Sequence, residues 1–182
     1  MVARIPVGSH LGIEFKSHDN SLAVQLSNKA VHNLLLQASR EYPNETGGVL
    51  LGHYDAALHT ATVTALGPWS RDSVKRAASF VRGNSGLNSF LRKLWLTTVC
   101  KEHYLGEWHT HPNSVPEPSR VDRETMWSIA KDEKALCPEP ILLILAGSLK
   151  HVADVGVFIF PRGGREIQLL ACLSDVLRLT AR

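Results

Sequence analysis

Cysteine is scarce in this sequence, and its placement excludes the frameworks that cysteine builds. The 182 residues contain three cysteines, Cys100, Cys137 and Cys172, which are widely spaced and form no C-x-x-C pair. An odd and scattered set of this kind indicates neither a disulfide scaffold nor a cysteine-based zinc knuckle. It favours a reducing compartment, so we expect a cytoplasmic protein.

Long apolar runs and strong charge of one sign are also missing. No segment approaches the roughly 20 apolar residues of a membrane span, and residues 1–7 lack the apolar stretch of a signal peptide. The net charge is only +3, and Arg71, Lys75 and Arg76 form a small basic cluster. A nucleic-acid-binding protein usually carries a larger basic surface. We therefore expect a soluble protein that binds neither membranes nor nucleic acid.

The remaining composition is that of an ordinary globular protein. Hydrophobic residues make up 44% and charged residues 20% of the chain, with 13 glycines and 9 prolines. No internal repeat or Pro-, Gly- or Ser-rich linker divides the sequence. A chain of this length buries one adequate core, so we expect a single domain over residues 1–182, in which residues 1–20 are loosely ordered.

Apolar periodicity predicts a mixed α/β fold. Helices are expected from a cap at Ser27 to Pro43, over residues 87–98 and over 119–133, because apolar residues recur there at spacings of three and four. Short apolar or β-branched runs predict strands at residues 22–26, 47–52, 60–66, 104–111, 141–146, 155–160 and 167–171. The 47–52 and 60–66 strands are expected to pair. A short helix through Val176 and Leu179 is expected to cover one edge.

The segment that points to chemistry is His109-Thr-His111-Pro112, followed six residues later by Ser119 and then by Asp122. On a strand, side chains alternate between faces, so the two histidines project together. Pro112 ends the strand, and the prolines of the following loop turn the chain back. A catalytic zinc ion takes three protein ligands and leaves one position for water. The two imidazoles and the Asp122 carboxylate would supply these three protein ligands.

Each part of this segment also has a purely structural interpretation. Ser119-x-x-Asp122 matches the capping box that begins many helices, and a His-x-His strand is often only a polar outer face. The two structural interpretations do not explain why a capping box follows a proline-terminated His-x-His strand at this distance. A metal site explains these residues together, and it can coexist with the cap.

The spacing His109-x-His111-Pro-x₆-Ser119-x-x-Asp122 resembles the JAMM motif of the MPN/JAB family of zinc metallopeptidases. The family also carries a catalytic glutamate ahead of a glycine-containing strand, and Asn44-Glu45-Thr-Gly-Gly is similar to that element. The resemblance extends over about Leu22 to Phe160. It implies a cytidine-deaminase-like fold with a central mixed sheet flanked by helices in three α-β-α layers.

The resemblance also implies one zinc ion held by His109, His111 and Asp122, which makes a water molecule nucleophilic. Glu45 would remove the proton of that water and return it to the leaving amine. Ser119 would donate a hydrogen bond to the developing oxyanion. The bond cleaved would be a peptide or isopeptide bond.

A narrower resemblance is to bacterial JAMM deconjugases of anti-phage operons such as CBASS, through Gly106-Glu-Trp-His-Thr-His-Pro112 and the Pro-x-Pro-Ser segment ending at Ser119. It implies a protein substrate: a ubiquitin-like modifier, or a cGAS/DncV-like nucleotidyltransferase conjugated through its carboxyl terminus by a fused E1-E2 enzyme. RadC-type JAB domains share the His-to-Ser-to-Asp spacing, so the motif alone does not separate these groups.

Several other residues are candidates on weaker grounds. Glu107 shares a strand face with the two histidines and rivals Glu45 as the base, the alternatives being a partner of a metal ligand or a solvated edge residue. His53 is either a substrate contact or a surface histidine. Trp95 and Trp108 are expected in the core, whereas Trp69 or Trp127 would line the substrate groove if either does.

Two other classes of function fit the sequence less well. A catalytically inactive MPN scaffold that acts by binding partners usually lacks a motif ligand, and none is missing here. A zinc nucleoside deaminase uses H-x-E with a downstream P-C-x-x-C cluster. Cys137 precedes a proline and has no second cysteine at that spacing. The isopeptidase is therefore the preferred hypothesis.

Overall fold

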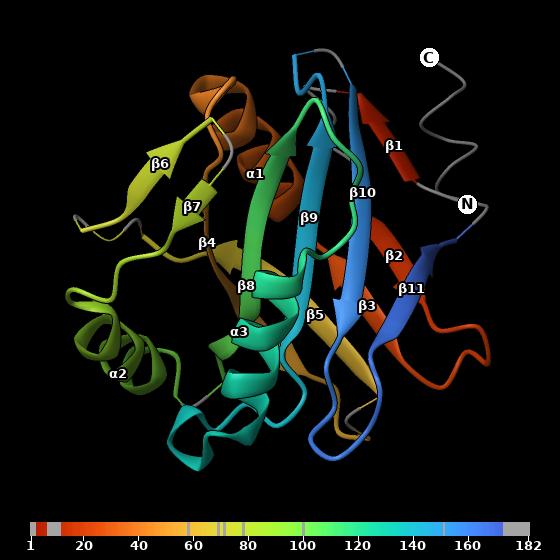
Figure 1. Ribbon diagram of the computed structural model, residues 1–182. Coiled ribbons are helices and arrows are strands. Elements are labelled where there is room, and N and C mark those ends of the chain that lie inside the picture. Colours follow the sequence, from red (N-terminus) through yellow and green to blue (C-terminus); the bar gives the residue numbers. More distant parts are fainter. Residues whose placement is uncertain are drawn as a thin grey trace.

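The computed structural model describes residues 3–6, 12–57, 59–68, 70, 72–77, 79–99, 101–150 and 152–172 (Figure 1). The helices are α1 (Asn28–Glu41), α2 (Leu87–Thr97) and α3 (Arg120–Lys131), followed by the short 3₁₀ turn η1 (Glu133–Ala135). The strands are β1 (Ala3–Pro6), β2 (Ile13–Lys16), β3 (Ala23–Leu26), β4 (Gly47–Tyr54), β5 (Thr60–Leu66), β6 (Val74–Arg76), β7 (Ser79–Val81), β8 (His103–Pro112), β9 (Ile141–Gly147), β10 (Val152–Ile159) and β11 (Ile167–Ala171).

The main sheet is mixed and closes on itself. Its order is β1-β10-β11-β2-β3-β5-β4-β8-β9, and the last strand, β9, also pairs with β10, which closes the sheet. The pairs β3–β5 and β8–β9 are parallel, and the other neighbours in this sheet are antiparallel, including β4 with β5. The prediction of a mixed α/β fold and of the β4–β5 pairing is confirmed. The strands form a barrel-like sheet, and the three-layer α-β-α arrangement stays a prediction.

Helix α1 begins and ends where the sequence predicts and supplies one side of the main core. The Ser27 hydroxyl accepts a hydrogen bond from the Ala30 amide at 3.2 Å, which satisfies one of the free amides at the helix start. Its buried face consists of Ala30, Val31, Leu34, Leu35 and Ala38. Burying each leucine side chain contributes roughly 1.5–3 kcal/mol, so this face holds α1 firmly against the sheet.

Strand β9 lies between two helices and fixes where α3 sits relative to α1. Leu143 and Leu145 belong to the core cluster that contains α1, whereas Leu142 and Ile144 pack with Met126 of α3. The alternation follows from the strand geometry, because successive side chains point to opposite faces. Figure 1 shows α3 on the near side of β8 and β9, with α1 behind them.

Some expectations from the sequence are wrong or lie outside the described residues. Residues 1–20 are not all loosely ordered, because β1 pairs with β10 and β2 pairs with β3. Helix α2 forms as predicted, yet none of its residues is buried, and Trp95 is 43% exposed. The helix expected through Val176 and Leu179 lies outside the described residues. Among the described residues, no helix is long and apolar enough to cross a bilayer.

Candidate metal centre

Strand β8 carries the two motif histidines on one face. It is held on both sides, by β4, where Gly47 lies opposite His109, and by β9, where Ile144 lies opposite His109. This support on two edges fixes the direction of the side chains. The Nε2 atoms of His109 and His111 are 3.0 Å apart, so both rings present the same nitrogen to one point.

Asp122 reaches that point from the first turn of α3. Its Oδ1 lies 3.5 Å from the His109 Nε2, and its Oδ2 lies 3.6 Å from the His111 Nε2. Two ligand atoms of a tetrahedral zinc ion with bonds of about 2.0–2.1 Å lie about 3.3 Å apart. The two Nε2 atoms are 3.0 Å apart, and each lies 3.5 to 3.6 Å from a different oxygen of Asp122. These separations are close to that value, so the three donor groups surround a point where a single ion of this kind could bind.

The protonation of the cluster also suits a cation. Nδ1 of His111 is 3.3 Å from the Val115 carbonyl oxygen, so this nitrogen holds the ring proton as the donor and leaves Nε2 with a free lone pair. Burial, together with His109, lowers the pKa of His111 and favours its neutral form. Burial acts to raise the pKa of Asp122, but hydrogen bonds from His109 and Ser119 hold it well below its usual value. Asp122 is therefore a carboxylate.

The capping box and the His109-His111-Asp122 cluster share Asp122. The Ser119 amide donates to Asp122 Oδ2 at 2.6 Å, and the Asp122 amide donates to the Ser119 hydroxyl at 3.2 Å. The capping interpretation of this pair is confirmed, and it is compatible with a metal site that uses the same carboxylate. Because Ser119 uses its hydroxyl oxygen as an acceptor, the hydroxyl hydrogen can serve as a donor to another group.

Glu45 lies in the loop that leads from α1 into β4. Its amide donates to the Arg76 carbonyl of β6 at 2.8 Å, and the next residue, Thr46, accepts a hydrogen bond from the Thr110 amide at 2.8 Å. These contacts hold the loop beside the histidine end of β8. Burial raises the pKa of the Glu45 carboxyl, against the effect of His109 and with a smaller contribution from Asp122. The pKa of the Glu45 carboxyl thus depends on the charges of His109 and Asp122.

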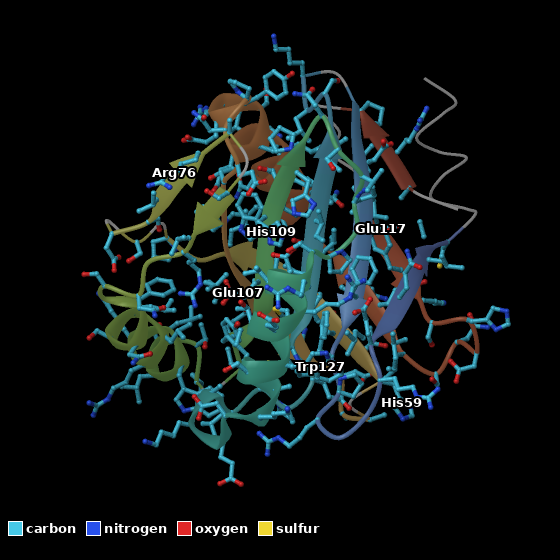
Figure 2. All side chains as sticks on the ribbon, viewed as in Figure 1. His59, Arg76, Glu107, His109, Glu117 and Trp127 are labelled. Carbon is cyan, nitrogen blue, oxygen red and sulfur yellow. The ribbon has the colours of Figure 1, made fainter. Side chains whose placement is uncertain are left out.

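The rival base Glu107 is buried and already engaged. Its Oε2 accepts a hydrogen bond from the Arg82 Nε at 2.6 Å, and its Oε1 accepts one from the Tyr104 hydroxyl at 2.8 Å. Burial raises the pKa of Glu107, and Arg82 and Tyr104 oppose that shift. Figure 2 shows Glu107 and His109 close together along β8. Glu107 is a buried partner in an ion pair, whereas Glu45 has no such partner in the described residues.

Of the other candidates, neither His53 nor Trp127 lines the cavity that contains His109 and Asp122. His53 pairs with Glu102 at 3.3 Å and is half-exposed. Trp108 is 1% exposed, which confirms its place in the core, whereas the expectation that Trp95 is buried is wrong. Trp127 packs edge-on against Phe160, with ring centroids 5.1 Å apart. Trp69 lies outside the described residues.

Two cavities meet at Arg82, a residue that the sequence did not single out. One cavity of about 320 Å³ is lined by Phe80, Arg82, Asn84, Glu107, His109 and Asp122 among others. A second cavity of about 380 Å³ is lined by Arg82 and by Gly47 and Gly48 of β4. The sequence around Arg82 has no clear periodicity and matches no motif. Its contact with Glu107 in the folded protein is what marks Arg82 as a candidate site residue.

Comparison with known proteins identifies the family. Residues 27–158 match the family described as prokaryotic homologs of the JAB domain. The chain is 32% identical over 157 residues to a protein of Enterobacter hormaechei subsp. hoffmannii (strain UCI 50) named CD-NTase/cGAS isopeptidase, with 86% of each chain covered. It is 28% identical over 125 residues to a protein of Sinorhizobium fredii (strain NBRC 101917 / NGR234) named "Probable metalloprotease y4qB", covering 68% of this chain and 76% of the relative.

A solved structure agrees at the level of the fold. The solution structure of protein DSY2949 from Desulfitobacterium hafniense superposes with a TM-score of 0.52 at 21% identity, over 81% of this chain and 88% of that one. The family match spans most of the chain and includes β8, α3 and the His-His-Asp cluster. The resemblance noted in the sequence is thus confirmed, and the protein belongs to the prokaryotic homologs of the JAB domain.

Proposed function

We propose that this protein is a zinc-dependent isopeptidase that acts as a single domain and releases a conjugated protein from its target by hydrolysis. The observation that supports this most strongly is the convergence of the His109, His111 and Asp122 donor atoms, which lie within 4.8 Å of one another. They lie beside a carboxyl group, Glu45, that has no ion-pair partner in the described residues. Peptide hydrolysis needs this combination of an ion and a free base.

His109, His111 and Asp122 would hold one Zn²⁺. A bound zinc ion supplies Lewis acidity and lowers the pKa of water toward about 7. The His111 contact with Val115 keeps Nε2 available, and the capping box holds the Asp122 carboxylate in place. The chemistry of these three donor groups suits the ion.

Glu45 and Ser119 would divide the proton transfer and the charge stabilisation. Glu45 accepts a proton from the attacking water, whose oxygen bonds to the carbonyl carbon. Ser119 donates its hydroxyl hydrogen to the oxyanion as negative charge develops there. Glu45 then delivers the proton to the amine nitrogen as the C–N bond breaks, which leaves a carboxylic acid and an amine. The acid transfers its remaining proton to the amine, so the final products are a carboxylate and an ammonium group. No covalent intermediate with the protein forms.

The substrate we propose is an extended carboxyl-terminal tail. Strand β4 pairs with β5 from Leu50 onward, so Gly47 and Gly48 have a strand partner on the β8 side and a cavity on the other. An added peptide strand suits such an edge. The names of the relatives point to a CD-NTase as the conjugated protein, which a fused E1-E2 enzyme would attach. A ubiquitin-like modifier is the alternative tail.

The test is hydrolysis of a CD-NTase conjugated through its carboxyl terminus to a lysine. We expect the zinc-loaded protein to convert the conjugate to two products on a gel, and a chelator to stop this until zinc is returned. Glu45→Ala should keep its zinc, measured by atomic emission, and lose hydrolysis. His53→Ala, which changes a half-exposed histidine outside the cluster, is the control.

Two results would contradict the proposal. If the zinc-loaded wild-type protein left both the CD-NTase conjugate and a ubiquitin-like conjugate intact, the isopeptidase activity would be excluded. A zinc-loaded Glu45→Ala variant with full activity would remove Glu45 from the mechanism and leave the metal assignment standing.

A further inference from the structure

We propose that Arg82 is a substrate-positioning residue, whose free guanidinium nitrogen donates a hydrogen bond to a main-chain carbonyl of the bound tail. This inference rests on the proposed function, since it concerns how the same cleft holds its peptide. It assigns to Glu107 the task of fixing the Arg82 side chain.

The buried carboxylate of Glu107 anchors one edge of the guanidinium. Glu107 is 8% exposed, and its two oxygens accept from Arg82 Nε at 2.6 Å and from the Tyr104 hydroxyl at 2.8 Å. Charge-assisted contacts of this length are strong and directional. The buried carboxylate therefore sets the plane of the Arg82 side chain before any substrate arrives.

The second nitrogen of the guanidinium is also engaged. Arg82 Nη1 donates to the Gly83 carbonyl at 3.1 Å and to Asn84 Oδ1 at 2.8 Å. An arginine has five N–H donors, and these contacts account for Nε and Nη1. Within the described part of the chain, no hydrogen bond is formed by Nη2. Its two hydrogens are left for a ligand in a fixed direction.

Arg82 lies on the path that we propose for the tail. It lines the cavity that contains His109 and Asp122, and it also lines the cavity beside Gly47 and Gly48. A peptide laid along the edge of β4 toward the metal cluster therefore meets this side chain. Arg82 stands between the docking edge and the site of hydrolysis.

The charge balance indicates which group Nη2 binds. The positive charge of Arg82 is compensated at 2.6 Å by Glu107, and the carboxylate of Asp122 lines the same cavity. A carboxylate of the substrate would gain little binding energy from Arg82, because Glu107 already neutralises its charge, and it would be repelled by the Asp122 carboxylate. A neutral acceptor fits better, and an extended peptide presents a carbonyl oxygen at every residue. Arg82 thus recognises the backbone of the tail and not an acidic side chain.

The test measures binding separately from hydrolysis. The probe is a fluorescent peptide of the last ten residues of the CD-NTase used in the conjugate, titrated by anisotropy against zinc-loaded protein. Because a lost hydrogen bond to a charged group weakens binding by about tenfold or more, we expect that loss for Arg82→Met. Arg82→Lys keeps the charge near Glu107 but lacks the forked donor, so it should lose nearly as much.

Matched variants keep the result interpretable if Arg82→Met folds poorly. The double variant Arg82→Met with Glu107→Leu removes the buried pair together, which avoids an unpaired carboxylate, and should show the same loss. Arg162→Met is the control, because Arg162 Nε also donates a 2.6 Å hydrogen bond, to Ala130, but lines neither cavity. Its peptide affinity should equal that of the wild type.

The positioning role of Glu107 has its own readout. Glu107→Gln should weaken peptide binding in the wild-type background and have no further effect when Arg82 is already Met, a non-additivity that a purely structural role would not produce. Folded Arg82→Lys and double variants with wild-type affinity would overturn the proposal, as would a wild-type protein that does not bind the peptide. A protein that binds it through Arg82 yet fails to hydrolyse the conjugate would refute only the proposed function.

Discussion

Gly106 of β8 lies so close to Ile141 of β9 that a β-carbon at position 106 would be 1.9 Å from the Ile141 carbonyl oxygen. The obstacle is backbone and belongs to the parallel pairing that supports the metal cluster. Gly106→Ala must therefore push the two strands apart. We expect a loss of about 3 kcal/mol or more in the free energy of unfolding, at the upper end of overpacking effects.

Urea unfolding followed by circular dichroism measures this loss. Gly164→Ala is the control, since the nearest atom to its new β-carbon would be Pro161 Cβ at 3.3 Å, in a turn. Equal midpoints for the two variants would show that β8 and β9 can separate at Gly106 without cost.

The double use of Ser119 gives a prediction that separates capping from chemistry. Ser119→Ala removes the cap acceptor, so the protein should lose about 1 kcal/mol of stability along with hydrolysis. Ser119→Asp keeps a capping acceptor but has no hydroxyl hydrogen. It should retain stability and still lose hydrolysis, as measured by thermal unfolding and by the conjugate assay. An active Ser119→Asp variant would limit Ser119 to the cap.

Metal binding should appear as a shift in thermal stability. A ligand that binds only the folded state adds about 2.7 kcal/mol at a hundred times its dissociation constant. We expect added zinc to raise the melting temperature of the wild type and not that of His111→Ala or Asp122→Asn. His53→Ala, changed at a side chain 45% exposed, should respond like the wild type. An unchanged zinc response in Asp122→Asn would remove Asp122 from the ligand set.

The described cysteines should differ in reactivity. Burial raises the pKa of Cys137 to about 12, and the thiolate is the form that reacts with alkylating reagents. Cys172 is half-buried. We expect iodoacetamide at pH 8 to modify Cys172 before Cys137 in the native protein, and both after unfolding in urea. Peptide mass spectrometry at each site measures this, and early labelling of Cys137 would show that its surroundings open readily.

The sequence predicted most of the elements because their physics is local. The Ser27 cap, the apolar run of β9 and the His109-x-His111 alternation each depend on residues a few positions apart. The five residues assigned from the JAMM resemblance lie in three segments that the fold brings near one another, and their catalytic roles remain a prediction.

What the sequence did not predict depends on distant partners. The apolar residues through Leu94 and Trp95 recur at helical spacing, which predicts the helix. The spacing does not predict how much of that helix face the sheet covers, and Trp95 is 43% exposed. The short strand β1 finds its partner β10 about 150 residues away. Glu107 shares a strand face with the histidines, which made it a candidate base, but its carboxylate accepts a hydrogen bond from Arg82, which follows a separate hairpin.

The reciprocal hydrogen bonds between Ser119 and Asp122 connect metal exchange to the end of a helix. Since the carboxylate is oriented by the amide that begins α3, an ion entering the site has little side-chain ordering left to impose. Fraying of the first turn would release the cap and the ligand in the same motion. The rate at which zinc leaves should then follow the opening rate of that turn, and the same hydrogen bonds that start the helix would set how long the metal stays.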